Sequence, residues 1–411
     1  MGRPHMKNKG SIAYLTHTFP LFSTTFISDE IDEMRRQGAD LKLFAIRRPL
    51  SDEYPPEFQR FVDETHYIFP LNLLRLIRRH IVAFISTPWG YLSNLGYALF
   101  QTEHSLRDRI RSLIYFVEAI YIYPTIKENR CSHIHAHVLT GGASIALFIK
   151  RSYGMTFSQT AHGTDIFSDT FLLRQKIANA VFTRVGTEFN RRHLAANLDG
   201  TSISPIVVIP FGIEIDRYLS DSGKSKGEGG LRLLTVGRLT WQKAQHLLLE
   251  AYSHVLKDFK DIHLTIIGEG EEREHLESLC ETLALKGRVS MLGALDKESV
   301  RIEYLNSDLF ILSSISEGFG IVLLEAMSSG LPVIAPRLNG IPEIIADGIS
   351  GRLFETGSIE DMARIISELL RDEPQRKRLG KAARKIAYER FQLRNSIDRF
   401  YHELRERVDI E

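Results

Sequence analysis

The chain has 411 residues, 43% of them hydrophobic and 25% charged, and its formal net charge is +1. A chain of this length is too long for one compact core, so we expect two domains of about 200 residues each. With only two cysteines, Cys131 and Cys280, a disulfide framework is excluded. We find neither a secretion signal nor an uninterrupted apolar run of about 18 residues, and we expect a globular cytoplasmic protein.

Charge is distributed unevenly along the chain. Residues 1–210 carry 24 Lys and Arg against 18 Asp and Glu, whereas residues 211–411 carry 28 against 33. A basic first half suits an anionic acceptor or a membrane surface, although an excess this small also arises by chance. We expect no nucleic-acid partner.

Short apolar segments alternate with helical patterns through the first half. A strand at 11–15 leads into a loop rich in Pro, Ser and Thr, and a helical pattern follows, as at the start of a doubly wound α/β domain. The long, apolar and basic stretch 67–116 shows no clear strand. Further strands are expected at 41–46, 133–137, 158–161 and 180–186, and helices at 26–37 and 143–151.

A second series of the same kind follows residues 206–212 and a polar tract at 220–230. Two successive series predict two Rossmann-like domains, with a ligand site at the carboxyl ends of their strands. Two C-terminal helices are expected to close the chain. The expected strands are 231–236, 262–267, 289–292, 309–312 and 333–335, and the expected helices are 242–258, 271–284, 297–306 and 320–329.

The segment from Glu317 to Glu325 reads Glu-Gly-Phe-Gly-Ile-Val-Leu-Leu-Glu. A helix that begins near Gly320 offers free backbone N–H groups as a seat for phosphate oxygens, and Gly318 and Gly320 let a ligand approach closely. The two carboxylates accept hydrogen bonds from hydroxyl groups, which suits a ligand that carries both phosphate and sugar. The alternative is an ordinary amphipathic helix with an exposed Glu.

The residues after Glu325 complete a recognisable pattern: Ala326-Met327-Ser328-Ser329-Gly330-Leu331-Pro332, then Asn339-Gly340-Ile341-Pro342-Glu343 and Asp347-Gly348-Ile349-Ser350-Gly351. This resembles the E-x7-E segment of the retaining glycosyltransferases of family 4, which have the GT-B fold. The resemblance is strong over residues 204–390 and looser before them. It implies an acceptor-binding Rossmann-like domain at 6–211, a donor-binding one at 212–390, and a C-terminal helix at 391–411 that returns toward the first domain.

Arg238 and Lys243 stand where a strand ends and a helix begins. Both can reach a diphosphate, Arg as a fork and Lys as a point charge, and the alternative is a solvated helix start. The resemblance implies that both bind the donor pyrophosphate. It further implies a donor site with Glu317 at the sugar, Glu325 at the ribose, Leu295 at the nucleobase, and the backbone of Gly318, Phe319, Gly320 and Ile321 at the phosphates.

Gly268-Glu269-Gly270 also follows a strand and invites a dinucleotide interpretation. Arg273 stands in place of the third glycine, and the acidic residues would repel a pyrophosphate, so we predict a tight strand–helix turn instead. We expect no cofactor, and a nucleoside-diphosphate sugar as co-substrate.

His162 follows a strand, and the resemblance implies that it approaches the donor sugar; a histidine satisfied within the fold is the alternative. His133, His135 and His137 share one face of a strand, which is a conceivable metal geometry. Because no accompanying acid or Cys cluster is visible, we expect no metal site. His137, nearest the carboxyl end of the strand, is expected to contact the acceptor.

The loop from Thr18 to Ile27 resembles that of a subgroup associated with capsule, exopolysaccharide and O-antigen assembly. The subgroup commonly reads Ser-Glu-Thr-Phe, and this chain has Thr24 in place of the Glu. The resemblance implies acceptor contacts from Ser23, Thr24 and Thr25. No Asp-x-Asp motif occurs, so we expect the cations of Arg238 and Lys243 to replace a metal electrostatically.

Residues 71–85 combine a basic cluster with an apolar face. Such a segment fits a membrane interface near a lipid-linked acceptor, at the inner face of the plasma membrane. A core-packing helix with a solvated basic side is the alternative.

These expectations describe a retaining, metal-independent glycosyltransferase that moves a sugar from a UDP or GDP sugar to a lipid-linked or growing cell-surface glycan. The expected catalytic residues are His162, Arg238, Lys243 and Glu317. A GT-B nucleotide-sugar epimerase usually lacks the full E-x7-E with its Arg and Lys partners, and a catalytically silent binding protein would be expected to have lost some of them. A transferase with a small soluble acceptor is a further alternative.

Overall fold

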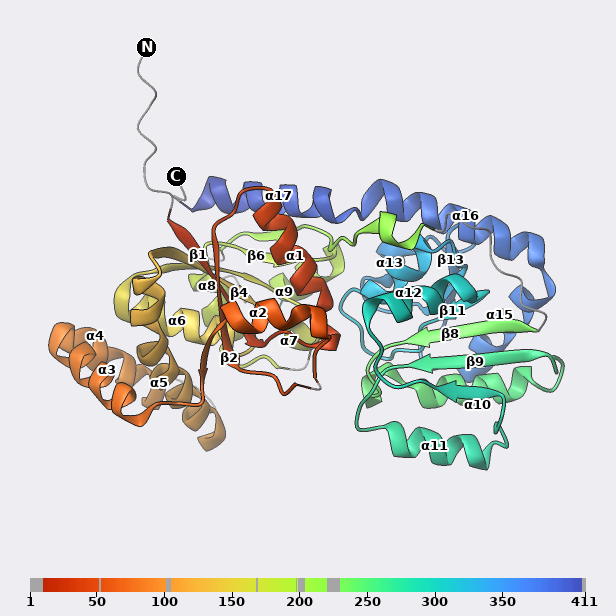
Figure 1. Cartoon of the computed structure of the whole chain (residues 1–411), viewed down its shortest axis with the longest axis horizontal. Coiled ribbons are helices and arrows are strands. Elements are labelled where there is room, and N and C mark those ends of the chain that lie inside the picture. Colours follow the sequence, from red (N-terminus) through yellow and green to blue (C-terminus); the bar gives the residue numbers. More distant parts are fainter. Residues whose placement is uncertain are drawn as a thin grey trace, which may run out of the picture. The chain divides into compact units, whose positions relative to one another are not determined.

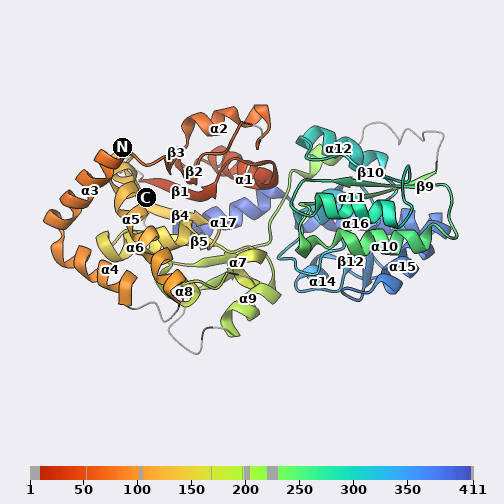
Figure 2. The same cartoon turned by 90° about the horizontal axis from the view of Figure 1, so that it is seen from below.

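A computed structural model describes residues 10–51, 53–100, 105–167, 169–196, 198, 204–219 and 230–408. They form two compact units (Figures 1 and 2). The first unit comprises the described residues within Met1–Gly186, Asn190–Ile209 and Ile397–Glu411, and the second those within Thr187–Phe189 and Pro210–Ser396.

The first unit is built on a seven-stranded parallel sheet with the order β3-β2-β1-β4-β5-β6-β7. Its strands are β1 (Ser11–Thr18), β2 (Leu41–Arg47), β3 (His66–Phe69), β4 (Cys131–His137), β5 (Thr156–Thr160), β6 (Thr183–Val185) and β7 (Ile206–Val208). The accompanying helices are η1 (Phe22–Thr24), α1 (Thr25–Arg36), η2 (Pro56–Phe58), α2 (Gln59–Glu64), α3 (Leu73–Ser86), α4 (Pro88–Phe100), α5 (Leu106–Glu128), α6 (Gly142–Tyr153), α7 (Gly163–Phe167), α8 (Leu173–Asn179) and α9 (Glu188–Ala196).

The second unit has a six-stranded parallel sheet with the order β10-β9-β8-β11-β12-β13. Its strands are β8 (Leu231–Val236), β9 (Ile262–Ile267), β10 (Val289–Met291), β11 (Leu309–Ile311), β12 (Val333–Pro336) and β13 (Gly351–Phe354). Its helices are η3 (Ile215–Tyr218), η4 (Trp241–Lys243), α10 (Gln245–Val255), α11 (Arg273–Thr282), α12 (Lys297–Asn306), α13 (Ile321–Ser328), α14 (Ile341–Ile344), α15 (Ile359–Arg371) and α16 (Glu373–Arg390). A last helix, α17 (Leu393–Arg407), has only its first four residues in this unit.

Both sheets have the apolar character of parallel sheets whose two faces are covered by helices. Consecutive residues of a strand point to opposite faces, yet Leu233 and Leu234 of β8 are both fully buried. Helices occupy both sides of each sheet in Figures 1 and 2. The predicted class, two Rossmann-like α/β domains with parallel sheets, is confirmed.

The structure corrects the sequence expectations in three places. The stretch 67–116 contains most of β3, the helices α3 and α4, and the beginning of α5. The strand β13 was not expected, because it is only four residues long and includes Arg352. Three helices rather than two end the described chain. Between α15 and α16, Asp372 accepts a hydrogen bond from Gln375 N and Pro374 occupies the first turn, which starts a new helix.

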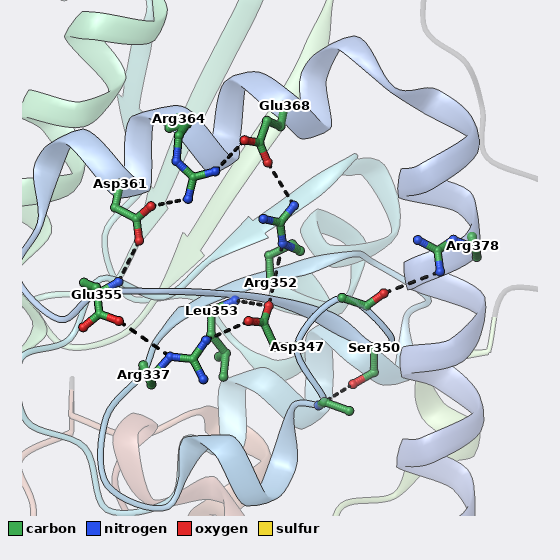
Figure 3. Close-up of polar contacts among 12 residues, drawn as sticks. Arg337, Asp347, Ser350, Arg352, Leu353, Glu355, Asp361, Arg364, Glu368 and Arg378 are labelled. Carbon is green, nitrogen blue, oxygen red and sulfur yellow. Dashed lines mark hydrogen bonds and ion pairs between the residues drawn. The ribbon is translucent and has the colours of Figure 1, made fainter.

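A network of polar contacts beside β13 holds residues 347–351 (Figure 3). Asp347 Oδ2 accepts a hydrogen bond from Arg337 Nη2 at 2.7 Å, and its Oδ1 accepts one from Leu353 N at 3.0 Å. Arg352 Nε lies 3.7 Å from the same Oδ1. This part of the pattern behind the resemblance therefore fixes a loop against a strand.

The final helix, α17, begins in the second unit and ends in the first. In the first unit the Phe400 ring lies 4.8 Å from that of His135, and the Arg184 guanidinium lies 4.6 Å from the Phe400 ring centre. Arg399 Nη2 donates to Val208 O at 3.2 Å. None of the helices formed by the described residues has both the length and the apolarity needed to cross a bilayer.

Candidate active site

The turn after β8 carries Arg238 and Lys243, and it is braced by the loop after β9. Gly237 N donates to Ile267 O at 2.9 Å, and a Cβ on Gly268, where φ is +140°, would come within 1.9 Å of Gly237 O. Only glycine fits such a close backbone approach. The prediction that Gly268-Glu269-Gly270 forms a tight structural turn is confirmed.

Lys243 and Glu317 form an ion pair at the carboxyl ends of β8 and β11. Lys243 Nζ lies 2.5 Å from Glu317 Oε2, and the side chains are 22% and 11% exposed. Ser313 Oγ donates to Lys243 O at 2.8 Å, and Ser314 Oγ donates to Glu317 Oε2 at 3.3 Å. Lys243, which was expected at the donor diphosphate, and Glu317, which was expected at the donor sugar, therefore contact each other directly.

Arg238 lies in the same turn with its side chain exposed, and among the described residues its guanidinium makes no hydrogen bond or ion pair. Its carbonyl accepts from Gln245 Nε2 at 3.0 Å, which fixes the backbone where α10 begins. The guanidinium is therefore available to an anion from solution.

The helix α13 begins where the sequence predicts. Gly320, its N-cap, has φ of +82° and no side chain caps the helix. Leu323 N donates to Gly320 O at 2.9 Å, so among the described residues the N–H groups of Ile321 and Val322 are left to other acceptors. Phe319 is buried, with its ring 5.1 Å from that of Phe211. Asn339 Nδ2 donates to Glu317 O at 3.0 Å, which holds the loop before the helix.

Glu325 has a partner that the sequence did not indicate. Tyr304 of α12 donates its hydroxyl to Glu325 Oε2 at 2.9 Å and lies 3.3 Å from Val322 O. Burial, and then the negative charge of Glu325, hold the pKa of Tyr304 well above its ordinary value, so the hydroxyl stays a donor. Leu295 is partly buried against the apolar cluster that contains Phe319.

In the first unit, two of the three β4 histidines are satisfied by the neighbouring strand. His133 Nε2 and His135 Nδ1 lie 2.8 and 2.9 Å from Ser158 Oγ, and their other ring nitrogens lie near Thr156 and Thr160. Burial lowers the pKa of His133 to about 3, so this ring is neutral. Both histidines have a structural role.

His137 belongs to a buried polar cluster that leads to His162. His137 Nε2 lies 2.8 Å from His162 Nε2, and its Nδ1 contacts Tyr14 Oη and lies 3.3 Å from Glu30 Oε1. Arg184 Nη1 donates to Glu30 Oε2 at 2.7 Å. The His137 side chain is completely buried and both ring nitrogens are engaged, so its predicted acceptor contact has no exposed atom to make it.

Glu30 corrects the expectation that no acid accompanies the histidines. Ligand atoms of Glu30, His135 and His137 lie within 4.8 Å of one another, the spacing of a metal site within the described residues. Each already has protein partners, and the Arg184 cation on Glu30 opposes a second cation there. Burial raises the pKa of Glu30, but the Arg184 charge and the contacts with His137 and His135 together outweigh it and hold the pKa well below its ordinary value. An internal ion pair explains this cluster.

The expected acceptor loop forms η1, directly before α1. Thr24 Oγ1 accepts from Leu21 N at 2.9 Å and lies 3.2 Å from Leu21 O, so this hydroxyl closes its own loop. Thr25 is the first residue of α1 and is partly exposed. The side chain of Ser23 lies outside what the structure describes.

Comparisons with known proteins bear on both units. The family model described as "Glycosyl transferases group 1" matches residues 220–386. The sulfoquinovosyl transferase SQD2 of Arabidopsis thaliana is 37% identical over 155 residues, which are 37% of this chain and only 29% of that protein. The N-acetyl-alpha-D-glucosaminyl L-malate synthase of Bacillus anthracis is 34% identical over 281 residues, 65% of this chain and 72% of that protein.

Among solved structures, Anabaena HepE in complex with UDP-glucose is similar over 97% of this chain and 100% of that chain, with a TM-score of 0.74 and 18% identity. At that identity the likeness concerns the fold. It confirms that the two parallel-sheet units have the arrangement of elements found in GT-B proteins.

Proposed function

The chain belongs to the glycosyl transferases of group 1, and we propose that it transfers a sugar from a nucleoside-diphosphate sugar to a hydroxyl acceptor with retention of the anomeric configuration. One observation carries the proposal: the Lys243–Glu317 ion pair, 2.5 Å long, stands beside a helix start that no side chain caps. A cation, a carboxylate and free backbone amides suit a ligand that carries phosphates and hydroxyls.

We propose that the diphosphate binds Lys243, the exposed guanidinium of Arg238 and the amides at the start of α13. A second anion beside Lys243 shares its charge, and the Glu317 carboxylate can then accept hydrogen bonds from the donor sugar. As the bond to the sugar breaks, negative charge grows on the leaving diphosphate, and these preorganised donors stabilise it. This charge stabilisation is the main catalytic contribution of the second unit.

At the nucleoside end, Glu325 is proposed to accept from the ribose hydroxyls. A carboxylate has about four acceptor positions, so Glu325 can keep the Tyr304 hydrogen bond and still bind ribose. Leu295 is proposed to contact the base. The UDP-glucose complex of HepE makes uracil the first base to test, with guanine second.

The first unit is proposed to hold the acceptor, with contacts from the loop of Ser23, Thr24 and Thr25, and to place His162 at the donor sugar. His137 contributes to this arrangement by fixing the His162 ring. A leaving phosphate oxygen can take the acceptor proton, so no protein base is required. We propose a lipid-linked or growing cell-surface glycan as acceptor.

We propose that no metal takes part. Arg238, Lys243 and the start of α13 supply the positive charge that a divalent cation would otherwise bring to a diphosphate.

Binding of donors to the full chain tests the proposal. Melting is followed with UDP-, GDP-, ADP- and dTDP-sugars, and one of them should raise the midpoint because it binds only the folded state. The same donor should leave the midpoint of Lys243→Ala unchanged. A chain that responds to no nucleotide sugar contradicts the proposal, and a donor whose sugar is isomerised without transfer identifies an epimerase.

A further inference from the structure

The outward side of α3 is apolar. At about 100° per residue, Leu74, Ile77, Ile81 and Ile85 lie along one side of the helix. All four side chains are at least half exposed, and Leu74 is 81% exposed, whereas Ala83 on the opposite side is buried. A helix whose only role is to pack on a core shows the reverse pattern.

The next helix, α4, continues this surface. Trp89 is 85% exposed and Phe100 76%, and their separation of eleven residues places both on one side of the helix. The two helices touch: His80 Nδ1 lies 2.9 Å from Tyr91 Oη. Figures 1 and 2 both show α3 and α4 side by side. Together they form a hairpin with an apolar exterior.

Charge on this hairpin has one sign. Residues 66–100 contain Arg75, Arg78 and Arg79 but no Asp or Glu. Arg75 and Arg78 are exposed, and within the described part of the chain neither guanidinium has an ion-pair partner.

Arg79 differs from the other two arginines because it turns inward. Its Nη1 contacts Tyr121 O, and its Nη2 donates to Thr125 Oγ1 at 2.9 Å, which fastens α3 to α5. The surface therefore presents two cations rather than the three that the sequence suggests.

We propose that the outer side of this hairpin binds the surface of an anionic lipid bilayer. The α3–α4 face is defined by Leu74, Arg75, Ile77, Arg78, Ile81, Ile85, Trp89 and Phe100. Apolar side chains enter the boundary between headgroups and acyl chains, Trp89 sits at the interface, and the arginines pair with lipid phosphates. If the acceptor is lipid-linked, as proposed above, this contact brings the first unit to it.

A second copy of the chain fits this face less well. Pairing two such faces would place Arg75 and Arg78 of both copies at one interface with no acid from this hairpin to compensate them. An anionic bilayer offers both an apolar phase and negative charge, and it matches the two properties of the face together.

Trp89 is a direct reporter, because Trp241 is the only other tryptophan. In a Trp241→Phe chain, vesicles of phosphatidylcholine with phosphatidylglycerol should shift Trp89 emission to shorter wavelength, and lipids brominated on their acyl chains should quench it. Salt should weaken the effect. Trp89 emission that is unchanged by these vesicles overturns the proposal. A blue shift that grows with protein concentration in the absence of lipid indicates self-association and also overturns it.

Paired variants distinguish vesicle binding by this face from a nonspecific effect of losing charge or apolar surface anywhere on the protein. Arg75→Gln with Arg78→Gln should lower vesicle partitioning about thirtyfold, and Ile81→Gln with Ile85→Gln should lower it on vesicles with and without phosphatidylglycerol. The double variant Lys257→Gln with Lys286→Gln is the matched control for the arginines, and Ile349→Gln is the control for the isoleucines. All three of these residues are exposed in the second unit, and both control variants should bind vesicles as the parent does. Equal losses in the controls contradict the proposal. No donor or acceptor is present, so the result is independent of sugar transfer.

Discussion

Lys243 Nζ lies 2.5 Å from Glu317 Oε2, although 74 residues separate the two in the chain. Each side chain neutralises the other, so a change at one alters the charge that a ligand meets at both. Removal of Lys243 would take away a cation and also leave an unpaired carboxylate beside the phosphate seat.

Replacing Lys243 with Ala should therefore lower kcat/KM by about 30- to 1000-fold, which is about 2–4 kcal/mol of transition-state stabilisation. Steady-state kinetics with a verified donor and acceptor measure it, with exposed Lys257→Ala as control. Adding Glu317→Gln to Lys243→Ala should cost less than Glu317→Gln alone, because the residues act as a pair. Full turnover by Lys243→Ala would remove the diphosphate role.

Tyr304→Phe should weaken nucleotide binding about two- to tenfold. The hydroxyl that donates to Glu325 Oε2 at 2.9 Å is lost, and one hydrogen bond contributes about 0.5–1.5 kcal/mol. Calorimetric titration of the parent and the variant with the nucleotide measures the change in Kd. Tyr388→Phe, at an exposed tyrosine of α16, is the matched control. Equal affinity in all three chains would show that the Tyr304 hydrogen bond to Glu325 does not contribute to nucleotide binding.

Turnover should be the same with and without EDTA. The exposed Arg238 and the paired Lys243 supply positive charge at the proposed diphosphate site. Initial rates before and after chelation, and after return of Mg²⁺ or Mn²⁺, check this. A rate that vanishes with the chelator and recovers with the cation would show that these side chains do not replace a metal.

Glu118 should make the protein less stable as pH rises. Burial raises the pKa of this α5 carboxyl to about 7, partly offset by Arg47. Between its ordinary pKa of 4.5 and about 7, the unfolded chain releases a proton that the folded chain keeps. The free energy of unfolding therefore falls by up to about 3 kcal/mol through this window. Glu118 Oε2 also has no hydrogen-bond partner in the described structure.

Glu118→Gln should remove this component. The variant should melt higher than the parent above pH 7, and the difference should shrink toward pH 4.5. Thermal melts of both chains across that range measure the difference, and the comparison cancels the titration of the histidines. Parallel pH profiles for the two chains would mean that Glu118 ionises normally.

The regular elements were predictable where hydrophobic pattern and length agree. The bounds of β8, β9 and α12 match their predictions. Contacts between residues far apart in the sequence could not be predicted in this way. No local pattern indicates the contact between Lys243 and Glu317, the hydrogen bond from Tyr304 to Glu325, or the contacts of Glu30 with the histidines. Such contacts follow from the packing of whole elements.

The contacts of the β4 histidines with β5 could have been predicted from the sequence. Thr156, Ser158 and Thr160 alternate along β5, and they stand in register with His133, His135 and His137 of β4. Hydroxyls spaced like the histidines on an adjacent parallel strand indicate hydrogen-bonded rings. This pattern would have favoured the structural interpretation of His133 and His135 over a metal site.

Because Phe400 packs on His135, the first unit takes part of its interior from the end of the chain. During synthesis on a ribosome, β1 to β7 emerge first, but the surface that packs against α17 stays uncovered until α17 has emerged. The second unit is almost complete before α17 emerges. The unit that is translated first is therefore the one that finishes folding last, and a premature stop codon before α17 would damage the beginning of the protein more than its middle.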